Sequence, residues 1–209
     1  MVSEGGDDDD ECPVCFQKMI LPTAVPACGH KFCFLCIKGA AIREGETTCP
    51  TCRGDVSPSI FKKPVDRGAT LDMHDPESPS VALKSSRPRS SGGEGGSGVQ
   101  ERVDDDVDAD PEVRHPGPAR FYWLYKGRGG WWRFDPRLEK DIEAGRAATP
   151  DSTDLIICGY AYVLDFVKMV QYRKETPTRT REIKRVSDKE FKAMSDNGEV
   201  KGISGVRVA

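Results

Sequence analysis

Long hydrophobic runs are missing from this chain of 209 residues. No apolar stretch approaches the ~20 residues that a membrane-spanning helix requires. The N-terminal sequence MVSEGGDDDD is acidic and has no apolar core of the kind found in a secretory signal. These absences argue against membrane and secreted proteins. We therefore expect the chain in the cytosol and possibly the nucleus, where thiols stay reduced.

Large apolar residues are also scarce in the middle of the chain. Residues 58–113 are rich in Gly, Ser, Pro and charge, as in SSRPRSSGGEGGSG and DDDVDAD. Such a composition cannot bury enough surface to offset the entropy lost on ordering. We predict an acidic disordered tail at 1–10 and a flexible linker at 58–113. Basic residues gather between Arg173 and Arg185, where they would attract a ligand that carries phosphates.

What the chain does contain is a dense group of cysteines near its N-terminus. Between residues 12 and 52 the pattern is C-x2-C-x12-C-x-H-x2-C-x2-C-x12-C-x2-C. These ligands form two sets of four, and zinc binds four nitrogen or sulfur ligands in closed structural sites. We predict two structural Zn²⁺ ions with no open coordination position; a disulfide framework is the disfavoured alternative in a reducing compartment. The predicted metal ligands are Cys12, Cys15, Cys28, His30, Cys33, Cys36, Cys49 and Cys52.

This spacing resembles the RING finger of the C3HC4 type. The gaps around His30 fit that family better than they fit LIM or PHD modules, which are the other two-zinc candidates. The resemblance implies a domain at 11–57 with interleaved sites. One zinc would be held by Cys12, Cys15, Cys33 and Cys36, and the other by Cys28, His30, Cys49 and Cys52. The segment has too few large apolar residues for a core, so the metal must supply stability, ~10–16 kcal/mol per structural zinc.

The RING resemblance implies a partner and an activity. RING fingers recruit a ubiquitin-charged E2 enzyme and hold its thioester in a reactive pose, which is catalysis by positioning without a covalent intermediate on the RING. Val14 and Pro50 match the E2-facing positions of the family, and Leu35 is a further candidate. Arg53 occupies the "linchpin" position that bridges the E2 and ubiquitin with its fork of donors.

A second ordered segment begins near residue 120. RFYWLYK and WWRFD are strand-like and flank the turn GRGG, so we predict a hairpin. Asp135 and Pro136 are typical of a helix start, and Gly145 of its end. The stretches from residue 154 to 174 and TREIKRVS predict further strands, with Cys158 as a small core residue. One helix against a strongly curved antiparallel sheet is the expected arrangement.

This second segment resembles the WWE domain, with Trp123, Trp131 and Glu143 as the three letters of its name. The resemblance rests on GWWxxD and MVQYR and implies a domain at 114–187. The whole chain would then be α+β: a small cross-brace RING finger joined by a flexible linker to a curved half-barrel with one helix. RING followed by WWE resembles the poly(ADP-ribose)-dependent RING ubiquitin ligases of the Iduna type, as do CIKGA and KGISGVR.

WWE domains of this type bind iso-ADP-ribose, the internal unit of poly(ADP-ribose). Recognition of such a ligand needs a flat apolar face and an amide for adenine, and cations for phosphates. By resemblance, Gln171 would contact the adenine and Arg181 a phosphate. Tyr125, Trp132 and Tyr162 would line the pocket, and Arg128 could add a phosphate contact. Neighbours in a strand point to opposite faces, so Trp131 can be core while Trp132 faces the ligand.

The resemblance further implies that the ligand activates the RING. Lys38 matches a RING lysine that reaches the bound ligand. Lys201 matches a basic residue of a C-terminal extension, 188–209, that closes over the site. The expected partners are a charged E2, poly(ADP-ribosyl)ated proteins and an ADP-ribosylating enzyme, with no membrane and no DNA. Two alternatives stay open: a poly(ADP-ribose) adaptor with a non-catalytic RING, and a nucleic-acid binder that uses its aromatic and basic surface.

Overall fold

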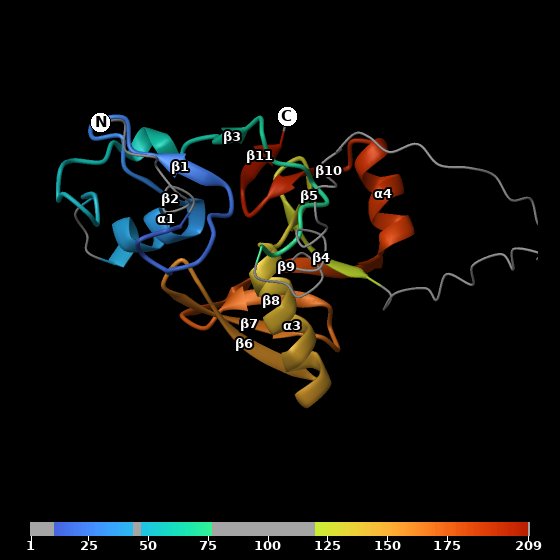
Figure 1. The fold of residues 1–209 in the computed structure, drawn as a ribbon. Coiled ribbons are helices and arrows are strands. Elements are labelled where there is room, and N and C mark those ends of the chain that lie inside the picture. The colour runs from blue at the N-terminus through green and yellow to red at the C-terminus, as the bar shows by residue number, and fades with distance from the viewer. Residues whose placement is uncertain (1–10, 44–46, 77–119, 209) are drawn as a thin grey trace, which may run out of the picture.

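The computed structural model describes residues 11–43, 47–76 and 120–208. The predicted tail at 1–10 and the linker from residue 77 onward lie outside the described residues. Figure 1 shows a small N-terminal module packed beside a long sheet, with the C-terminal strands between them. In the described part of the chain, no helix has the length and apolarity that crossing a membrane would demand.

The N-terminal module is built around a short hairpin and one helix. Its regular elements are β1 (Pro22–Ala24), β2 (Lys31–Cys33), α1 (Phe34–Arg43) and the 3₁₀ helix η2 (Pro58–Phe61). The buried apolar side chains Val25, Phe32, Ile37 and Val56 form a small core against three buried cysteines. A core of this size agrees with a fold that depends on metal.

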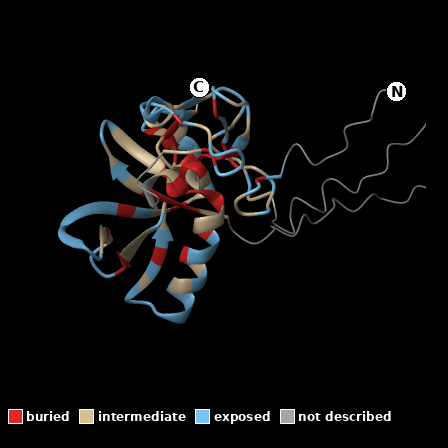
Figure 2. Cartoon of the chain, turned by 90° about the vertical axis from the view of Figure 1, so that its left-hand side faces the viewer, coloured by how far each residue is buried: buried red, intermediate tan, exposed pale blue. Residues whose placement is uncertain are grey.

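The second module is a nine-stranded sheet with two helices. Its elements are β3 (Val65–Asp66), β4 (Phe121–Gly127), β5 (Gly130–Arg133), α3 (Pro136–Ala148), β6 (Ser152–Ile157), β7 (Tyr160–Asp165), β8 (Val170–Arg173), β9 (Thr176–Ser187), α4 (Asp188–Asp196), β10 (Val200–Ile203) and β11 (Val206–Val208). The strand order is β3-β11-β10-β5-β4-β9-β8-β7-β6. The run from β5 to β6 is antiparallel, as the sequence predicts. Buried residues gather inside the modules and the hairpin ends are exposed (Figure 2).

A turn and a helix start form where the sequence predicts them. The β4–β5 hairpin turns at Gly129, which has φ +79°, a left-handed conformation that costs glycine little. Helix α3 begins at Pro136, where a missing backbone N–H costs nothing, and the Asp135 side chain caps it by accepting a hydrogen bond from the Arg137 N–H at 3.0 Å.

The end of α3 differs from the prediction. The helix passes through Gly145 and reaches Ala148, and Thr149 caps it by donating its backbone N–H to the Gly145 carbonyl at 2.8 Å. Gly145 is needed for a different reason: a β-carbon there would collide with the Thr153 side chain of β6. This glycine lets α3 lie close to the sheet instead of ending the helix.

The sheet is also larger than predicted. β10 pairs with β5, and β11 with β3, and both pairings are parallel. Helix α4 is a second helix that the prediction of one helix missed; its capping box of Ser187 and Glu190 was available in the sequence. Residues 58–76, assigned to the flexible linker, instead form η2 and β3 and continue along the sheet.

The two modules share one apolar cluster. Ile20, Leu21 and Phe34 of the N-terminal module pack against Ile203 and Val206 of the β10–β11 hairpin, and all five are buried. The C-terminal extension therefore joins the modules, because its apolar side chains fill the space between them. This arrangement fixes which surface of α1 faces the curved sheet.

Candidate functional site

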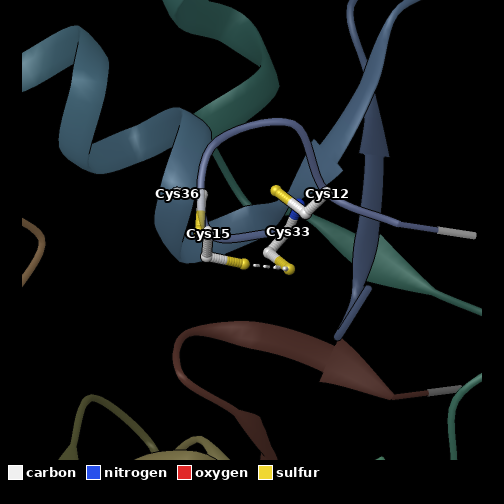
Figure 3. Close-up of side chains that lie close together, drawn as sticks. All are labelled: Cys12, Cys15, Cys33 and Cys36. Carbon is white, nitrogen blue, oxygen red and sulfur yellow. Dashed lines mark hydrogen bonds between the residues drawn. The ribbon is translucent and has the colours of Figure 1, made fainter. Parts of the chain in front are cut away.

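The first group of potential metal ligands comprises four cysteines from the N-terminal module. Figure 3 shows Cys12, Cys15, Cys33 and Cys36 converging from the first knuckle, the end of β2 and the first turns of α1. Their sulfur atoms lie within 4.8 Å of one another. The Sγ atoms of Cys15 and Cys33 are 3.9 Å apart. A tetrahedron with Zn–S bonds of ~2.3 Å has edges of about 3.8 Å, so the donors fit zinc.

The electrostatics of this cluster also require a cation. Hydrogen bonds with Cys33 and Cys36 lower the pKa of Cys12, whereas hydrogen bonds with Cys12 and Cys33 raise the pKa of Cys36. Four thiols at this separation cannot all ionise beside one another unless a positive ion balances them. Backbone N–H groups of Ile20 and Cys33 donate to Cys33 Sγ at 3.3 Å and Cys12 Sγ at 3.4 Å, which would stabilise thiolate ligands.

The second group of potential metal ligands is the other predicted set of four. Cys28, His30, Cys49 and Cys52 bring their ligand atoms within 4.8 Å of one another. His30 presents Nδ1, which is 3.6 Å from Cys49 Sγ. All eight predicted ligands therefore fall into the two predicted sets. When bound, two Zn²⁺ ions would brace this module without an open position for catalysis.

The candidate E2-contact residues divide between two surfaces. Pro50 and Arg53 are exposed at the last knuckle, where Arg53 has φ +59° and donates its backbone N–H to the Cys49 carbonyl at 2.8 Å. Val14 is half-buried and lines a groove of about 810 Å³ between the modules. Leu35 lines the same groove and packs against the shared apolar cluster. E2 binding by these residues stays a prediction, and the position of Leu35 also suits contact between the modules.

A second candidate site is a cavity of about 610 Å³ where α1 faces the curved sheet. It brings together five of the predicted ligand residues from both modules. They are Lys38, Tyr125, Tyr162, Gln171 and Arg181. Tyr125 comes from β4, Tyr162 from β7, Gln171 from β8 and Arg181 from β9, so the site exists only when the sheet is paired in register.

One polar atom in this cavity lacks a partner. Gln171 is 4% exposed, and its Oε1 is the single buried side-chain oxygen or nitrogen in the described residues without a hydrogen-bond partner. A buried, unsatisfied acceptor costs ~1–3 kcal/mol, so a bound group with an N–H donor would relieve a penalty that the fold carries. The atom marks where the cavity can recognise a ligand.

The cavity is cationic around an aromatic wall. Lys38, Arg173 and Arg181 line it, and its lining within the described residues includes no Asp or Glu. The Arg181 guanidinium lies 5.9 Å from the Tyr125 ring centroid. Burial raises the pKa of the Tyr125 phenol well above its usual range, so it stays a neutral donor. The site can therefore hold an anionic ligand with a flat ring.

Three other predicted ligand residues lie outside this lining. Trp132 is paired with Tyr125 and shares its face, and its indole covers Gly127, where a β-carbon would collide with it. Lys201 Nζ donates to the Gly198 carbonyl at 2.6 Å. Arg128 is exposed in the hairpin turn. Trp131 packs against the cluster of Tyr122 and Phe191 and is half-buried, on the opposite face from Trp132.

Several residues that line the cavity were not predicted from the sequence. Arg173 is held by donating its Nε–H to the Tyr162 hydroxyl at 2.9 Å. Cys158 is not in a strand core as predicted but in the β6–β7 turn with φ +50°, half-buried beside Gly39 of α1. Leu138, from the first turn of α3, also faces the cavity. Only the basic residues between 173 and 185 could have indicated Arg173. The positions of Cys158 and Leu138 in the lining depend on how the modules pack.

Trp123 and Glu143, two of the three residues that name the WWE motif, stabilise the fold and do not line the cavity. The Trp123 ring is buried and donates its Nε1–H to Glu143 Oε1 at 2.7 Å. Arg185 binds the same carboxylate through Nε at 2.7 Å and Nη2 at 3.1 Å. These bonds help to lower the pKa of Glu143 although burial opposes them. These hydrogen bonds among Trp123, Glu143 and Arg185 hold α3 against strands β4 and β9.

A further contact links α3 to the zinc module. Arg137 Nη1 donates to Cys15 Sγ at 3.3 Å and to Gln17 Oε1 at 3.4 Å. Asp135 holds the same guanidinium with two bonds of 3.1 Å. Arg137 thus sits between the helix cap of the sheet module and a predicted zinc ligand, next to Leu138 in the cavity. This connection was not foreseen, because it spans 122 residues of chain.

The fold and the two sites define a zinc-dependent RING finger joined to a WWE domain. The family models agree: the "Zinc finger, C3HC4 type (RING finger)" matches residues 12–52, and the "WWE domain" matches residues 121–185. The chain is, beyond this, homologous to RNF146 proteins over 84% of its length.

The similarity to these relatives is modest and partial. "E3 ubiquitin-protein ligase rnf146" of Danio rerio is 32% identical over 175 residues, that of Xenopus tropicalis 31%, and RNF146 of Homo sapiens 29%. The chain spans 38%, 42% and 37% of the lengths of these three proteins. The activity of these relatives as whole proteins is therefore only a proposal for this chain.

Proposed function

We propose that this protein is a RING-type E3 ubiquitin ligase that binds poly(ADP-ribose) through its iso-ADP-ribose unit and is activated by it. The observation that carries the proposal is that RING residue Lys38 and WWE residues Gln171 and Arg181 line one cavity. A ligand there would touch both domains at once. Its substrates would be poly(ADP-ribosyl)ated proteins, which the ligase marks for degradation.

The cavity offers each group that iso-ADP-ribose requires. The unsatisfied Gln171 Oε1 would accept a hydrogen bond from the adenine amino group. The rings of Tyr125 and Tyr162 offer flat surfaces beside it. Arg181 and Lys38 would bind the two phosphates, with Trp132 on the same face of the sheet as Tyr125.

Activation would follow from ligand contact with two domains. A ligand changes an equilibrium only if it binds one state better than the other. Phosphates bound between Lys38 on α1 and Arg181 on β9 would favour the arrangement in which α1 is held against the sheet. The first zinc site and Val14 adjoin this helix, so the fixed helix would fix the E2-docking surface as well.

Binding can be tested at Gln171. In calorimetric titration with iso-ADP-ribose, Gln171→Leu is expected to weaken binding at least tenfold, ~1.4 kcal/mol, because the acceptor for adenine is gone. The same substitution removes an unpaired buried oxygen, so the melting temperature should stay equal or rise. Unchanged affinity would refute the adenine contact, and a large loss of thermal stability would show that Gln171 is chiefly structural.

Activation can be tested by E2-dependent discharge of ubiquitin. Iso-ADP-ribose should raise the discharge rate several-fold in the zinc-loaded protein, and Arg181→Ala or Trp132→Ala should abolish the stimulation. Arg146→Ala, on the exposed last turn of α3, is the matched control and should respond normally. Equal rates with and without ligand would reject the switch while leaving the binding role intact.

The same assay separates the ligase from an adaptor whose RING has no activity. Val14 and Arg53 have no place in the ligand cavity, so substitutions there should stop discharge and leave iso-ADP-ribose affinity unchanged. If Arg53→Ala and Val14→Ala change nothing, or if the unmodified protein never discharges ubiquitin, the adaptor is the better description.

A further inference from the structure

A second basic hollow adjoins the ligand cavity on the β8–β9 side. It measures about 660 Å³ and is lined by Tyr162, Gln171, Tyr172, Arg173, Thr176, Arg179 and Arg181. Tyr162, Gln171, Arg173 and Arg181 also line the ligand cavity, so the two spaces adjoin. The hollow therefore lies directly beside the ligand cavity.

Three arginines give this hollow its charge. Arg179 and Arg181 are two residues apart on β9, and both line the hollow. Both are exposed, and in the described ranges neither guanidinium takes part in an ion pair or a side-chain hydrogen bond. No acidic side chain lines the hollow in that part of the chain. Uncompensated cations this close repel one another, and an anion would relieve the repulsion.

Arg173 is fixed at the boundary between the two spaces. Its Nε–H donates to the Tyr162 hydroxyl at 2.9 Å, and its guanidinium carbon lies 3.8 Å from the Tyr160 ring centroid. The bond to Tyr162 raises the pKa of Arg173, which keeps its charge in place. A cation held by two rings has lost most of its freedom before a ligand arrives, so binding a phosphate there costs little ordering.

We infer that this hollow is a second anion subsite, which binds the phosphates of the ADP-ribose unit next to the one in the cavity. The inference rests on the proposed function and extends it: the protein would prefer an internal, continuing polymer over a single unit. Arg181 would lie between the two units, and Arg179 would contact only the second.

Titrations of the full zinc-loaded chain with two probes test this subsite. One probe is iso-ADP-ribose and the other is poly(ADP-ribose) of four units. Arg179→Gln should leave the Kd for iso-ADP-ribose within twofold and raise the Kd for the oligomer at least fivefold. It should also reduce the slope of log affinity against log salt for the oligomer by about one. Arg146→Gln removes the same charge from an exposed position on α3 and should change neither Kd.

The possible outcomes are distinct from those that test the proposed function. If Arg179→Gln alters both probes equally or neither, the second subsite is refuted while iso-ADP-ribose binding stands. If the unsubstituted chain ignores iso-ADP-ribose, the proposed function itself fails. A single-stranded RNA that displaces the oligomer from wild type but not from Arg179→Gln, at equal concentration, would assign the hollow to nucleic acid and overturn the polymer subsite.

Discussion

Replacing Cys33 with serine is expected to unfold the RING finger. Cys33 is fully buried, it supplies one ligand of the first set, and its sulfur accepts the Ile20 N–H. A structural zinc supplies ~10–16 kcal/mol of apparent folding free energy, more than the small core of this module can replace. Zinc content measured with a chromogenic chelator should fall below two ions per chain, and α1 should become sensitive to protease.

The matched control for this substitution is Cys158→Ser. Cys158 belongs to neither ligand set and lies in the β6–β7 turn, so this variant should retain two zinc ions. The WWE sheet has a separate core around Trp123, Phe134 and Ile142, and its protease resistance should outlast that of the RING. Two zinc ions retained by Cys33→Ser would contradict the assigned ligand sets.

Replacing Arg133 with methionine is expected to lower the free energy of unfolding by ~3–5 kcal/mol, because it leaves a buried carboxylate without its partner. Arg133 is 1% exposed and binds Glu139 through Nε at 2.9 Å and Nη2 at 2.7 Å. Burial raises the pKa of Glu139, and Arg133 opposes that rise. Urea unfolding of the sheet module measures the loss.

Arg133 makes a second set of contacts, which a double variant can separate from its ion pair with Glu139. Its Nη1 donates to the carbonyls of Leu71 and Met73, each at 2.7 Å, and so ties the segment after the RING to the WWE sheet. Arg133→Met with Glu139→Gln removes both charges, keeps an acceptor for the buried Trp123 N–H and should recover part of the stability. Protease sensitivity between 66 and 76 should rise in both variants. A double variant as unstable as the single one would show that the lost segment contacts, not the buried carboxylate, dominate.

The part of the metal chemistry that can be predicted from the sequence depends on short stretches of chain. Each C-x2-C pair fixes a knuckle whatever the rest of the chain does, and the count of ligands limits the sets to two. Strand alternation likewise places Trp131 and Trp132 on opposite faces before any pairing is known. These inferences use bonds and angles within a few residues, which is why the ligand count and the β4–β5 hairpin agree with the structure. The division of the ligands into two interleaved sets came from the RING resemblance, and the structure agrees with it.

The ligand site was predicted less completely. Five residues named from resemblance line the cavity, but Trp132, Arg128 and Lys201 stand outside its lining, and Arg173 and Leu138 were missed. Whether a side chain reaches a cavity depends on strand register and on bulges such as the one at Arg173 in the β8–β9 pair. A single sequence carries no record of that register.

The sequence by itself determined two zinc sites, a curved sheet with a capped helix, and a basic, aromatic face for an anionic ligand, because ligand spacing and alternation act over short stretches of chain. That Lys38 of the RING and Gln171 of the WWE domain share one cavity was predicted only by resemblance; the residues of each module alone do not imply it, and the tertiary structure brings them together. The physical reason is packing: Ile203 and Val206 from the chain's end fill the space between the modules, and Arg133 holds residues 71 and 73 against the sheet. Those contacts join residues sixty or more positions apart, and only the folded chain brings them together.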